Sequence, residues 1–280
     1  MTGKGQRLDT ALVIRGFASG REKAKELIAA GLVTVNSRPA VKASQMIQDT
    51  DGIDCTDMLH RYVGRGGEKL EKALQETGLS PKGFCCLDVG ASTGGFTDCL
   101  LQHGASRVYA LDVGHGQLHP QLCADERVVN LEGMDVRLTD EILIRIGMDR
   151  PEFCVMDVSF ISLETIWPAV EKLLNDRAVV ICLIKPQFEA GRAAVGKKGV
   201  VKDPAIHQTV LRQIIAFWAS AGWLVDYLSF SPITGGEGNI EYLAAVRRTD
   251  VVPVPVWSGD IRELTLTAKR TLYTKGGRTR

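Results

Sequence analysis

The sequence predicts an α/β protein with a mostly parallel sheet, preceded by a small α+β unit. From Phe84 onward, apolar strand-like segments alternate with helical segments, which is typical of right-handed βαβ units. Before that point, residues 1–60 show the spacing of two short helices and a strand. A length of 280 residues is also enough for about two domains.

Apolar residues at helical spacing predict the two helices of the N-terminal unit. Leu8 and Leu12 lie on one face of the first helix, and Ala24 and Leu27 lie on one face of the second. Residues 32–35 then have the composition of a strand. The expected domains are 1–60, a linker with the first helix of the next domain over 61–82, the sheet domain over 83–248 and a C-terminal extension over 249–280.

Seven strands are expected in the sheet domain. They lie at 84–89, 107–112, 127–131, 152–157, 178–184, 223–231 and 240–247. Helices are predicted at 69–77, 95–103, 138–146, 164–175 and 203–221. The turn before the last strand is rich in glycine, so the last two strands are predicted to pair antiparallel. The basic C-terminal end is either helical or loose.

Composition excludes several classes of protein. Hydrophobic residues make up 45% and charged residues 24%, which is ordinary globular usage. The longest apolar run, residues 178–184, is far shorter than the roughly 18 residues that a membrane-spanning helix needs. The polar N-terminus predicts no secretory signal, and the seven cysteines show no metal or disulfide spacing. We therefore expect a reduced, cytoplasmic protein without a metal site.

The net charge of +1 conceals basic segments at both ends of the chain. Residues 1–45 hold eight lysines and arginines against three acidic residues, and residues 269–280 hold five basic residues and no acid. Phosphate contacts supply most of the sequence-independent affinity for nucleic acids, so the first segment predicts a polyanionic partner. The alternative is a solvated surface without a partner.

The strongest local signal is the segment LDVGASTGGF at 87–96, between an apolar strand and a helix. Its glycines let the backbone turn sharply and approach a ligand closely. Ser92 replaces the second glycine of the dinucleotide fingerprint, and the Asp88 carboxylate disfavours a pyrophosphate. S-adenosylmethionine, which has a sulfonium and an amino group, therefore suits the loop better than NAD. A glycine-rich turn without a ligand is the alternative. The expected cofactor-binding residues here are Asp88, Gly90, Ser92, Gly94, Gly95 and Phe96.

Acidic residues after the next two strands favour a nucleoside site. Asp112 ends the second strand 22 residues after Gly90, where a carboxylate can accept hydrogen bonds from both ribose hydroxyls. Asp135 follows the third strand and is expected to face the adenine amino group, with Val113 beside the cofactor. Taken alone, each acid is better explained as a loop or helix-cap residue, and it is the combination with the first loop that favours the nucleoside site.

Further acids and lysines stand near the ends of predicted strands. Asp157 and Lys185 end the fourth and fifth strands, where open α/β sheets bind ligands. A lysine beside an apolar run is partly desolvated, which favours its neutral form and lets it act as a base. A snorkelling lysine is the alternative. Glu241 begins the last strand and Lys69 precedes the sheet, but spacing alone does not group the four residues.

Combined, these motifs resemble the TlyA (hemolysin A) family of ribosomal RNA 2′-O-methyltransferases, which is related to FtsJ. The first part of the chain resembles the alpha-L RNA-binding domain of a ribosomal small-subunit protein, through RLD at 7–9, REKA at 21–24 and AGLVTVN at 30–36. The rest up to residue 248 resembles the methyltransferase, through RGGEKL at 65–70, LDVGASTGGFTD at 87–98, DVSF at 157–160, KPQFE at 185–189 and GNIE at 238–241.

The resemblance implies a Rossmann-like S-adenosylmethionine-dependent methyltransferase of seven strands, the last antiparallel, behind a small N-terminal α+β RNA-binding domain. It implies a catalytic tetrad of Lys69, Asp157, Lys185 and Glu241, in which Lys185 deprotonates or orients a ribose 2′-hydroxyl. Asp157 is also expected to contact the cofactor. The implied partner is ribosomal RNA or a ribosomal subunit, with cytidine as the target. The residues expected to bind RNA are Arg7, Arg21, Lys23, Lys25 and Arg65.

Three other functions stand against this interpretation. A non-catalytic ribosome- or RNA-binding protein would not need the four tetrad residues. A membrane-active hemolysin, suggested by the second name of the family, would need a membrane-binding segment that the sequence does not predict. A nucleotide-dependent oxidoreductase disagrees with Ser92 and Asp88 in the glycine-rich loop.

Overall fold

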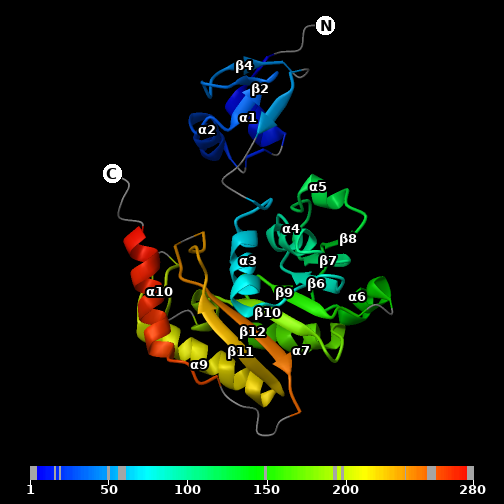
Figure 1. The fold of residues 1–280 in the computed structure, drawn as a ribbon, viewed down its shortest axis with the longest axis vertical. Helices are drawn as coiled ribbons and strands as arrows, with labels where there is room; N and C mark the ends of the chain where they lie inside the picture. Colours follow the sequence, from blue (N-terminus) through cyan, green and yellow to red (C-terminus); the bar gives the residue numbers. More distant parts are fainter. Residues whose placement is uncertain are drawn as a thin grey trace. The chain divides into compact units, whose positions relative to one another are not determined.

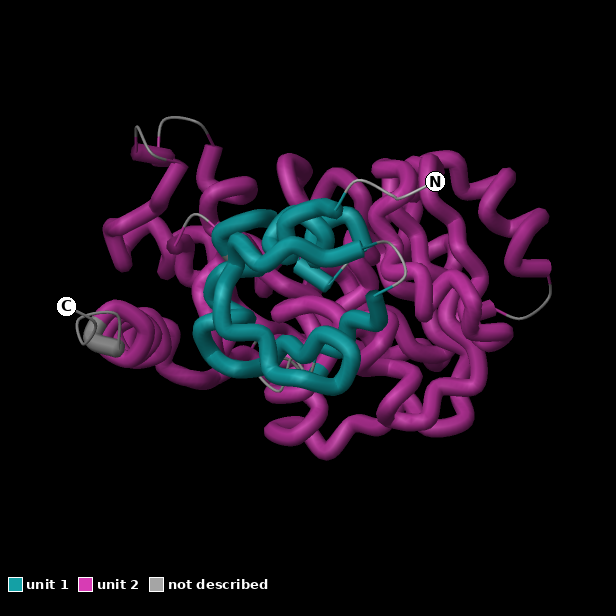
Figure 2. Tube along the Cα trace, turned by 90° about the horizontal axis from the view of Figure 1, so that it is seen from above, with its two compact units in different colours: residues 1–61 teal, residues 62–280 magenta. Residues whose placement is uncertain are grey.

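The computed structural model describes two compact units, Met1–Arg61 and Tyr62–Arg280 (Figures 1 and 2). The residues described are 5–15, 17–18, 20–48, 51–55, 61–147, 150–191, 194–196, 199–236, 238–250 and 257–275. The side chains of Lys23, Thr274 and Lys275 lie outside this description. Each unit is treated by itself below.

The N-terminal unit contains both predicted helices and the predicted strand. They are α1 (Leu8–Ile14), α2 (Arg21–Ala29) and β2 (Val33–Val35). Four further short strands accompany them in the described residues: β1 (Gln6–Arg7) pairs with β4 (Met46–Ile47), and β3 (Arg38–Pro39) and β5 (Ile53–Cys55) flank β2. These strands have two or three residues each, which is too short to show a period of two in the sequence.

The second unit is built on the seven-stranded sheet that the sequence predicts. Its strands are β6 (Cys85–Val89), β7 (Arg107–Asp112), β8 (Val128–Glu132), β9 (Phe153–Met156), β10 (Val179–Ile184), β11 (Trp223–Phe230) and β12 (Tyr242–Arg248). The order across the sheet is β11-β12-β10-β9-β6-β7-β8. Strands β6 to β10 pair parallel, whereas β12 is antiparallel to both of its neighbours, as the resemblance implied.

Helices cover both faces of this sheet (Figure 1). They are α3 (Gly66–Thr77), α4 (Gly95–Gln102), α5 (Pro120–Cys123), α6 (Thr139–Ile146), α7 (Leu163–Leu173), α8 (Pro186–Glu189), α9 (Pro204–Ser220) and α10 (Ile261–Lys275). Buried residues of α6, α7, α9 and α10 share one hydrophobic core with the sheet, and those of α3 and α4 share another. Neighbouring strand residues alternate between the cores: Leu87 belongs to the first and Cys86 to the second.

Helix α3 begins at Gly66, three residues before its predicted start. Glycine disfavours helices, but at position 67 a side chain has no room. A Cβ there would lie 2.2 Å from the ring of Tyr62, which is 2% exposed. Packing against this tyrosine therefore overrides helix propensity. The short helices α5 and α8 have four residues each and were not predicted.

The C-terminal extension forms helix α10. The basic end of the chain, for which the sequence left a helix or an irregular segment open, is therefore helical up to residue 275. Ala268 and Thr265 are buried, and Thr265 accepts a hydrogen bond from Gln208 on α9. The extension is therefore packed onto the second unit. The other part of the basic end, residues 276–280, lies outside the described residues.

His207, on α9, makes the stability of the second unit depend on pH. It is buried, with Nδ1 2.8 Å from the Tyr242 hydroxyl and Nε2 2.9 Å from the Val201 carbonyl oxygen. Burial lowers the pKa of His207, so the folded state favours neutral imidazole. The unfolded state then binds the additional proton, and stability is lost as the pH falls below about 6.5.

We expect the unfolding free energy of the wild type to decrease between pH 7.5 and 5.5 more steeply than that of His207→Gln, which cannot titrate. The variant should be less stable by about 1–2 kcal/mol at pH 7.5 because a hydrogen bond in the buried network is lost. Urea unfolding at several pH values measures both quantities. Parallel stability profiles for the two proteins would contradict the prediction.

Candidate active site

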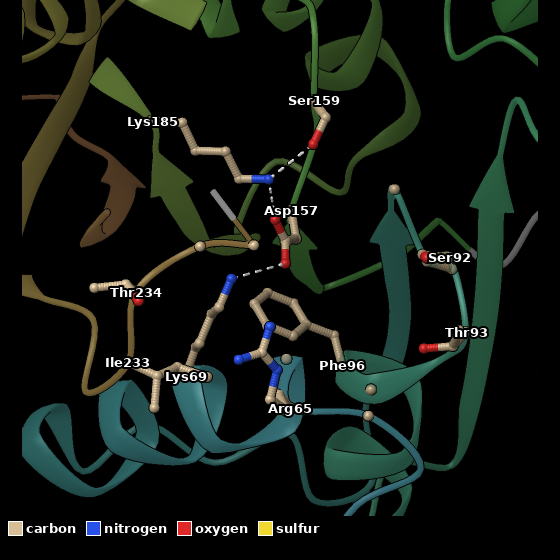
Figure 3. A pocket seen from close by; sticks show the side chains of 17 residues that line it. Arg65, Lys69, Ser92, Thr93, Phe96, Asp157, Ser159, Lys185, Ile233 and Thr234 are labelled. Carbon is tan, nitrogen blue, oxygen red and sulfur yellow. Dashed lines mark hydrogen bonds and ion pairs between the residues drawn. The ribbon is translucent and has the colours of Figure 1, made fainter. Parts of the chain in front are cut away.

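A cavity of about 280 Å³ lies at the carboxyl ends of β6, β9 and β10 (Figure 3). Its walls come from the start of α3, the loop after β6, the residues that follow β9 and β10, and the loop between β11 and β12. The strand order reverses between β6 and β9, because the chain runs outward through β7 on one side and through β10 on the other. Open α/β sheets bind their ligands at this point.

The four residues of the expected tetrad meet beside this cavity. The Lys185 Nζ lies 2.6 Å from Asp157 Oδ1, and the Lys69 Nζ lies 2.6 Å from Glu241 Oε2. Lys69 is also 3.6 Å from the second oxygen of Asp157, so this carboxylate lies between the two ammonium groups (Figure 3). Both lysines and Glu241 are less than one-tenth exposed. Two positive and two negative charges compensate one another in a buried position.

Each of these four side chains is positioned by the end of a strand or by the start of a helix. Asp157 and Lys185 directly follow β9 and β10, and the Asp157 amide donates to the Val89 carbonyl oxygen at the end of β6. Lys69 is in the first turns of α3. Glu241 directly precedes β12, and its carbonyl oxygen accepts a hydrogen bond from the Ser231 amide.

The electrostatics of Lys69 follow from this arrangement. Burial lowers the pKa of Lys69, but the attraction of Asp157 and Glu241 outweighs it and leaves the pKa above its usual value. Lys69 is therefore a charged group that holds two carboxylates, and it is not suited to act as a base.

One residue of the site was not identified from the sequence. The Ser159 hydroxyl accepts a hydrogen bond from Lys185 Nζ at 3.0 Å, and Ser159 lines the cavity. Its position two residues after Asp157, within the DVSF motif, is the one signal that could have identified it.

The expected cofactor residues fall into two groups. Those that line the cavity are Gly90, Ser92, Gly95, Phe96 and Asp157. Those that do not line it are Asp88, Gly94, Asp112, Val113 and Asp135. Gly90 has φ +86°, and a Cβ there would lie 2.6 Å from the carbonyl oxygen of Asp157. The loop after β6 and the end of β9 thus approach each other too closely for a side chain, and backbone groups form this part of the wall.

Asp88 is completely buried below the loop. One of its oxygens accepts a hydrogen bond from Thr97 at 2.6 Å, while the other has no protein partner within the described residues. Burial raises the pKa of Asp88 to about 7, with Asp157 adding to the shift. A buried acceptor without a partner is expensive, so this oxygen marks a place where a further donor would be stabilised.

Asp112 and Asp135 have partners in their own loops. Asp112 accepts hydrogen bonds from the amides of Ser92 at 2.8 Å and Gly114 at 2.7 Å, and thereby connects the loops after β6 and β7. The carboxylate of Asp135 is engaged by the guanidinium of Arg137. Val113 is 67% exposed.

The basic residues expected to bind RNA are partly paired with acids. In the N-terminal unit, the buried Asp9 carboxylate accepts hydrogen bonds from Arg7 at 2.8 Å and Arg21 at 3.2 Å, which leaves both arginine side chains about half-exposed. Lys25 pairs with Glu22 at 2.6 Å, and the side chain of Lys23 is outside the described residues. Arg65, in the second unit, lines the cavity.

The described part of the chain has neither a metal-binding cluster nor a membrane-spanning helix. It contains no group of three or more His, Cys, Asp or Glu side chains arranged to hold a metal ion. It also contains no helix whose length and hydrophobicity would suit a membrane span.

Comparison with known proteins places this geometry in a family. Residues 62–248 match the FtsJ-like methyltransferase family, and residues 6–53 match the S4 domain. YqxC of Bacillus subtilis is 50% identical over 243 residues, which cover 87% of this chain and 86% of YqxC. The 16S/23S rRNA (cytidine-2′-O)-methyltransferase TlyA of Mycobacterium tuberculosis is 42% identical, over 86% of this chain and 89% of that protein.

A solved structure from Streptococcus thermophilus extends the match to nearly the whole chain. It is 41% identical and covers 98% of this chain and 99% of its own, with a TM-score of 0.74. The sheet order, the buried tetrad and these matches agree, and the chain therefore belongs to the TlyA family of FtsJ-like methyltransferases, with an S4 domain at its N-terminus.

Proposed function

We propose that this enzyme transfers a methyl group from S-adenosylmethionine to the ribose 2′-oxygen of a cytidine in ribosomal RNA. The observation that carries the proposal is the buried group of Lys69, Asp157, Lys185 and Glu241 at the edge of the cavity. The M. tuberculosis relative is an rRNA (cytidine-2′-O)-methyltransferase by name, which supports cytidine as the target nucleotide. Such a substrate places the enzyme in the cytoplasm.

Three features support S-adenosylmethionine as the cofactor. Gly90 lines the cavity, and because a side chain there would collide with the Asp157 carbonyl, backbone groups face a ligand at this part of the wall. The unpartnered oxygen of the buried Asp88 suits a water that would connect this carboxylate to the ligand. Asp112, at the end of β7, is placed to accept hydrogen bonds from a ribose, in addition to those from Ser92 and Gly114. When bound, the sulfonium supplies an electrophilic methyl group.

The other residues expected to bind the cofactor are assigned to its surroundings as follows. Ser92, Gly95 and Phe96 contact the cofactor from the cavity wall, where Asp157 also reaches it. Gly94, with φ +95°, shapes the turn into α4. Val113 and Asp135 follow β7 and β8, and we assign both to the adenosine, for which Asp135 would share its carboxylate with Arg137.

Lys185 is the group that we assign to the 2′-hydroxyl. Its ammonium has three donors: it forms an ion pair with Asp157 and donates one hydrogen bond to Ser159. A further donor can hold the 2′-oxygen in line with the methyl group, which contributes by orientation. Proton transfer from Lys185 to Asp157 would leave an amine that accepts the hydroxyl proton. Lys69 and Glu241 hold Asp157 in position and balance its charge.

RNA binding is assigned to the basic residues of both units. The half-exposed guanidinium groups of Arg7 and Arg21, together with Lys23 and Lys25, supply phosphate contacts from the S4 domain. Arg65 lines the cavity and supplies a contact next to the target nucleotide.

Replacement of Lys185 tests the catalytic assignment. Lys185→Ala should lower the rate of methyl transfer by about 10²–10⁴-fold, because it removes both the orienting donor and the proton acceptor. Its affinity for S-adenosylmethionine should stay within about twofold of the wild type. Tritium transfer to separated ribosomal subunits and to free rRNA measures the rate, and resistance of one dinucleotide to alkaline hydrolysis identifies 2′-O-methylation.

The matched control is Lys172→Ala, an exposed lysine on α7 that should keep full activity. Wild-type turnover in Lys185→Ala would eliminate the assignment of Lys185. No transfer by the wild type to any ribosomal RNA, with cofactor binding confirmed, would favour a non-catalytic RNA-binding protein.

Replacement of Arg21 tests the RNA assignment. Arg21→Gln should weaken binding to rRNA and reduce the slope of log K against log salt by about one, because one phosphate contact is lost. Fluorescence anisotropy at several salt concentrations measures the slope. Arg145→Gln, an exposed arginine on α6, serves as the control for loss of charge elsewhere. An equal slope for Arg21→Gln and the wild type would show that Arg21 makes no phosphate contact and that RNA binds to another surface.

A further inference from the structure

Two segments that carry catalytic residues are joined side by side at the edge of the cavity. The first, residues 157–162, follows β9, and the second, residues 185–189, follows β10. Besides the ion pair between Lys185 and Asp157, three further pairs of side chains connect them. The Lys185 ammonium donates to Ser159, the rings of Phe160 and Phe188 lie 4.9 Å apart, and the Ser162 hydroxyl donates to Glu189 at 2.7 Å.

Glu189 makes the most extensive of these connections. Its second oxygen accepts a hydrogen bond from the Leu163 amide at 2.9 Å, at the first residue of α7. The Ser162 hydroxyl, held by Glu189, also accepts a hydrogen bond from the Glu164 amide at 3.2 Å. Both carboxylate oxygens are therefore used to fix the point at which the first segment enters α7. A carboxylate is also the favoured group at a helix N-terminus.

The backbone between these contacts needs such support. Phe160 has φ +64°, in the left-handed region, which costs a residue with a side chain free energy. Its side chain is 90% exposed, so burial in the core does not hold it there. The hydrogen bonds at Ser159 and Ser162, on either side of Phe160, are what keep this turn in its conformation.

We propose that Glu189 is a positioning residue for methyl transfer. It holds residues 157–162 in the conformation in which Asp157 and Ser159 both contact Lys185. Glu189 itself touches neither the cavity wall nor Lys185 in the described contacts. This inference rests on the proposed function, because its consequence is the orientation of Lys185 toward the 2′-oxygen.

Two substitutions of similar size separate the hydrogen bonds from packing. Glu189→Leu fills the space but accepts no hydrogen bond, whereas Glu189→Gln can still accept from Leu163 and can donate to Ser162. Glu189→Leu should lower kcat about tenfold, with KM for RNA and Kd for S-adenosylmethionine within twofold of the wild type. Glu189→Gln should restore kcat to within about threefold. Glu164→Leu, at the exposed neighbouring turn, is the control that should keep wild-type kcat.

A double-mutant cycle with Ser159→Ala tests whether Glu189 acts through the Lys185 contacts. If it does, Glu189→Leu should lose most of its effect on kcat when Ser159 is already absent. Additive losses would overturn the inference, as would wild-type kcat in Glu189→Leu or equal losses in the Leu and Gln variants. These outcomes would leave Glu189 with a purely structural role.

A crystal structure of Glu189→Leu distinguishes failure of this inference from failure of the proposed function. The expected result is that residues 157–162 move and that Phe160 leaves the left-handed region. An unchanged segment would overturn the inference even if the wild type is an active methyltransferase. An inactive wild type with a displaced segment in the variant would count against the proposed function alone.

Discussion

Asp157 is the carboxylate on which the geometry of the site depends, because both buried lysines contact it. Glu241 gives Lys69 a second partner, and the four groups then carry no net charge. This balance explains how a charged cluster can be buried at the end of a sheet at all, since an unpaired ion there would be severely penalised. It also ties catalysis to fold, because Lys185 keeps its place only while Asp157 does.

The antiparallel last strand is what completes this cluster. The carboxyl ends of parallel strands all lie at one edge of the sheet, so β9 and β10 deliver Asp157 and Lys185 to the same edge. An antiparallel strand brings its amino end to that edge instead. Tyr242, the first residue of β12, pairs with Ile184, the last residue of β10, so Glu241 arrives beside Lys185. A seventh parallel strand would have placed Glu241 at the opposite edge.

Much of the fold could be predicted from the sequence because long apolar segments with distinct periods define it. The seven strands and five of the helices are of this kind, and their boundaries differ from the structure by a few residues. The two-residue strands of the S4 domain and the start of α3 could not be predicted, since pairing with distant residues and contact with Tyr62 decide them. The tetrad could not be grouped by spacing either. Lys69 and Glu241 are 172 residues apart in the sequence, so only the resemblance to a family predicted that they belong to one site.

The distinction between local sequence signals and contacts with distant residues also applies to the residues around the tetrad. Asp112 ends a strand, which is a local signal, and its place at the end of β7 follows from the alternation of strands and helices. The hydrogen bond that it accepts from Gly114 is local, but the one from Ser92 spans 20 residues, and the two bonds show that an acid expected to bind a ligand also holds its loop. In the role that we propose for it, Glu189 extends this principle to residues 157–162. A site whose reactive lysine is held by one carboxylate and one hydroxyl needs a rigid backbone behind both of them, because small displacements of an orienting group are costly for the rate. In the role proposed for Glu189, hydrogen bonds that never reach the substrate therefore affect the rate through the groups that do.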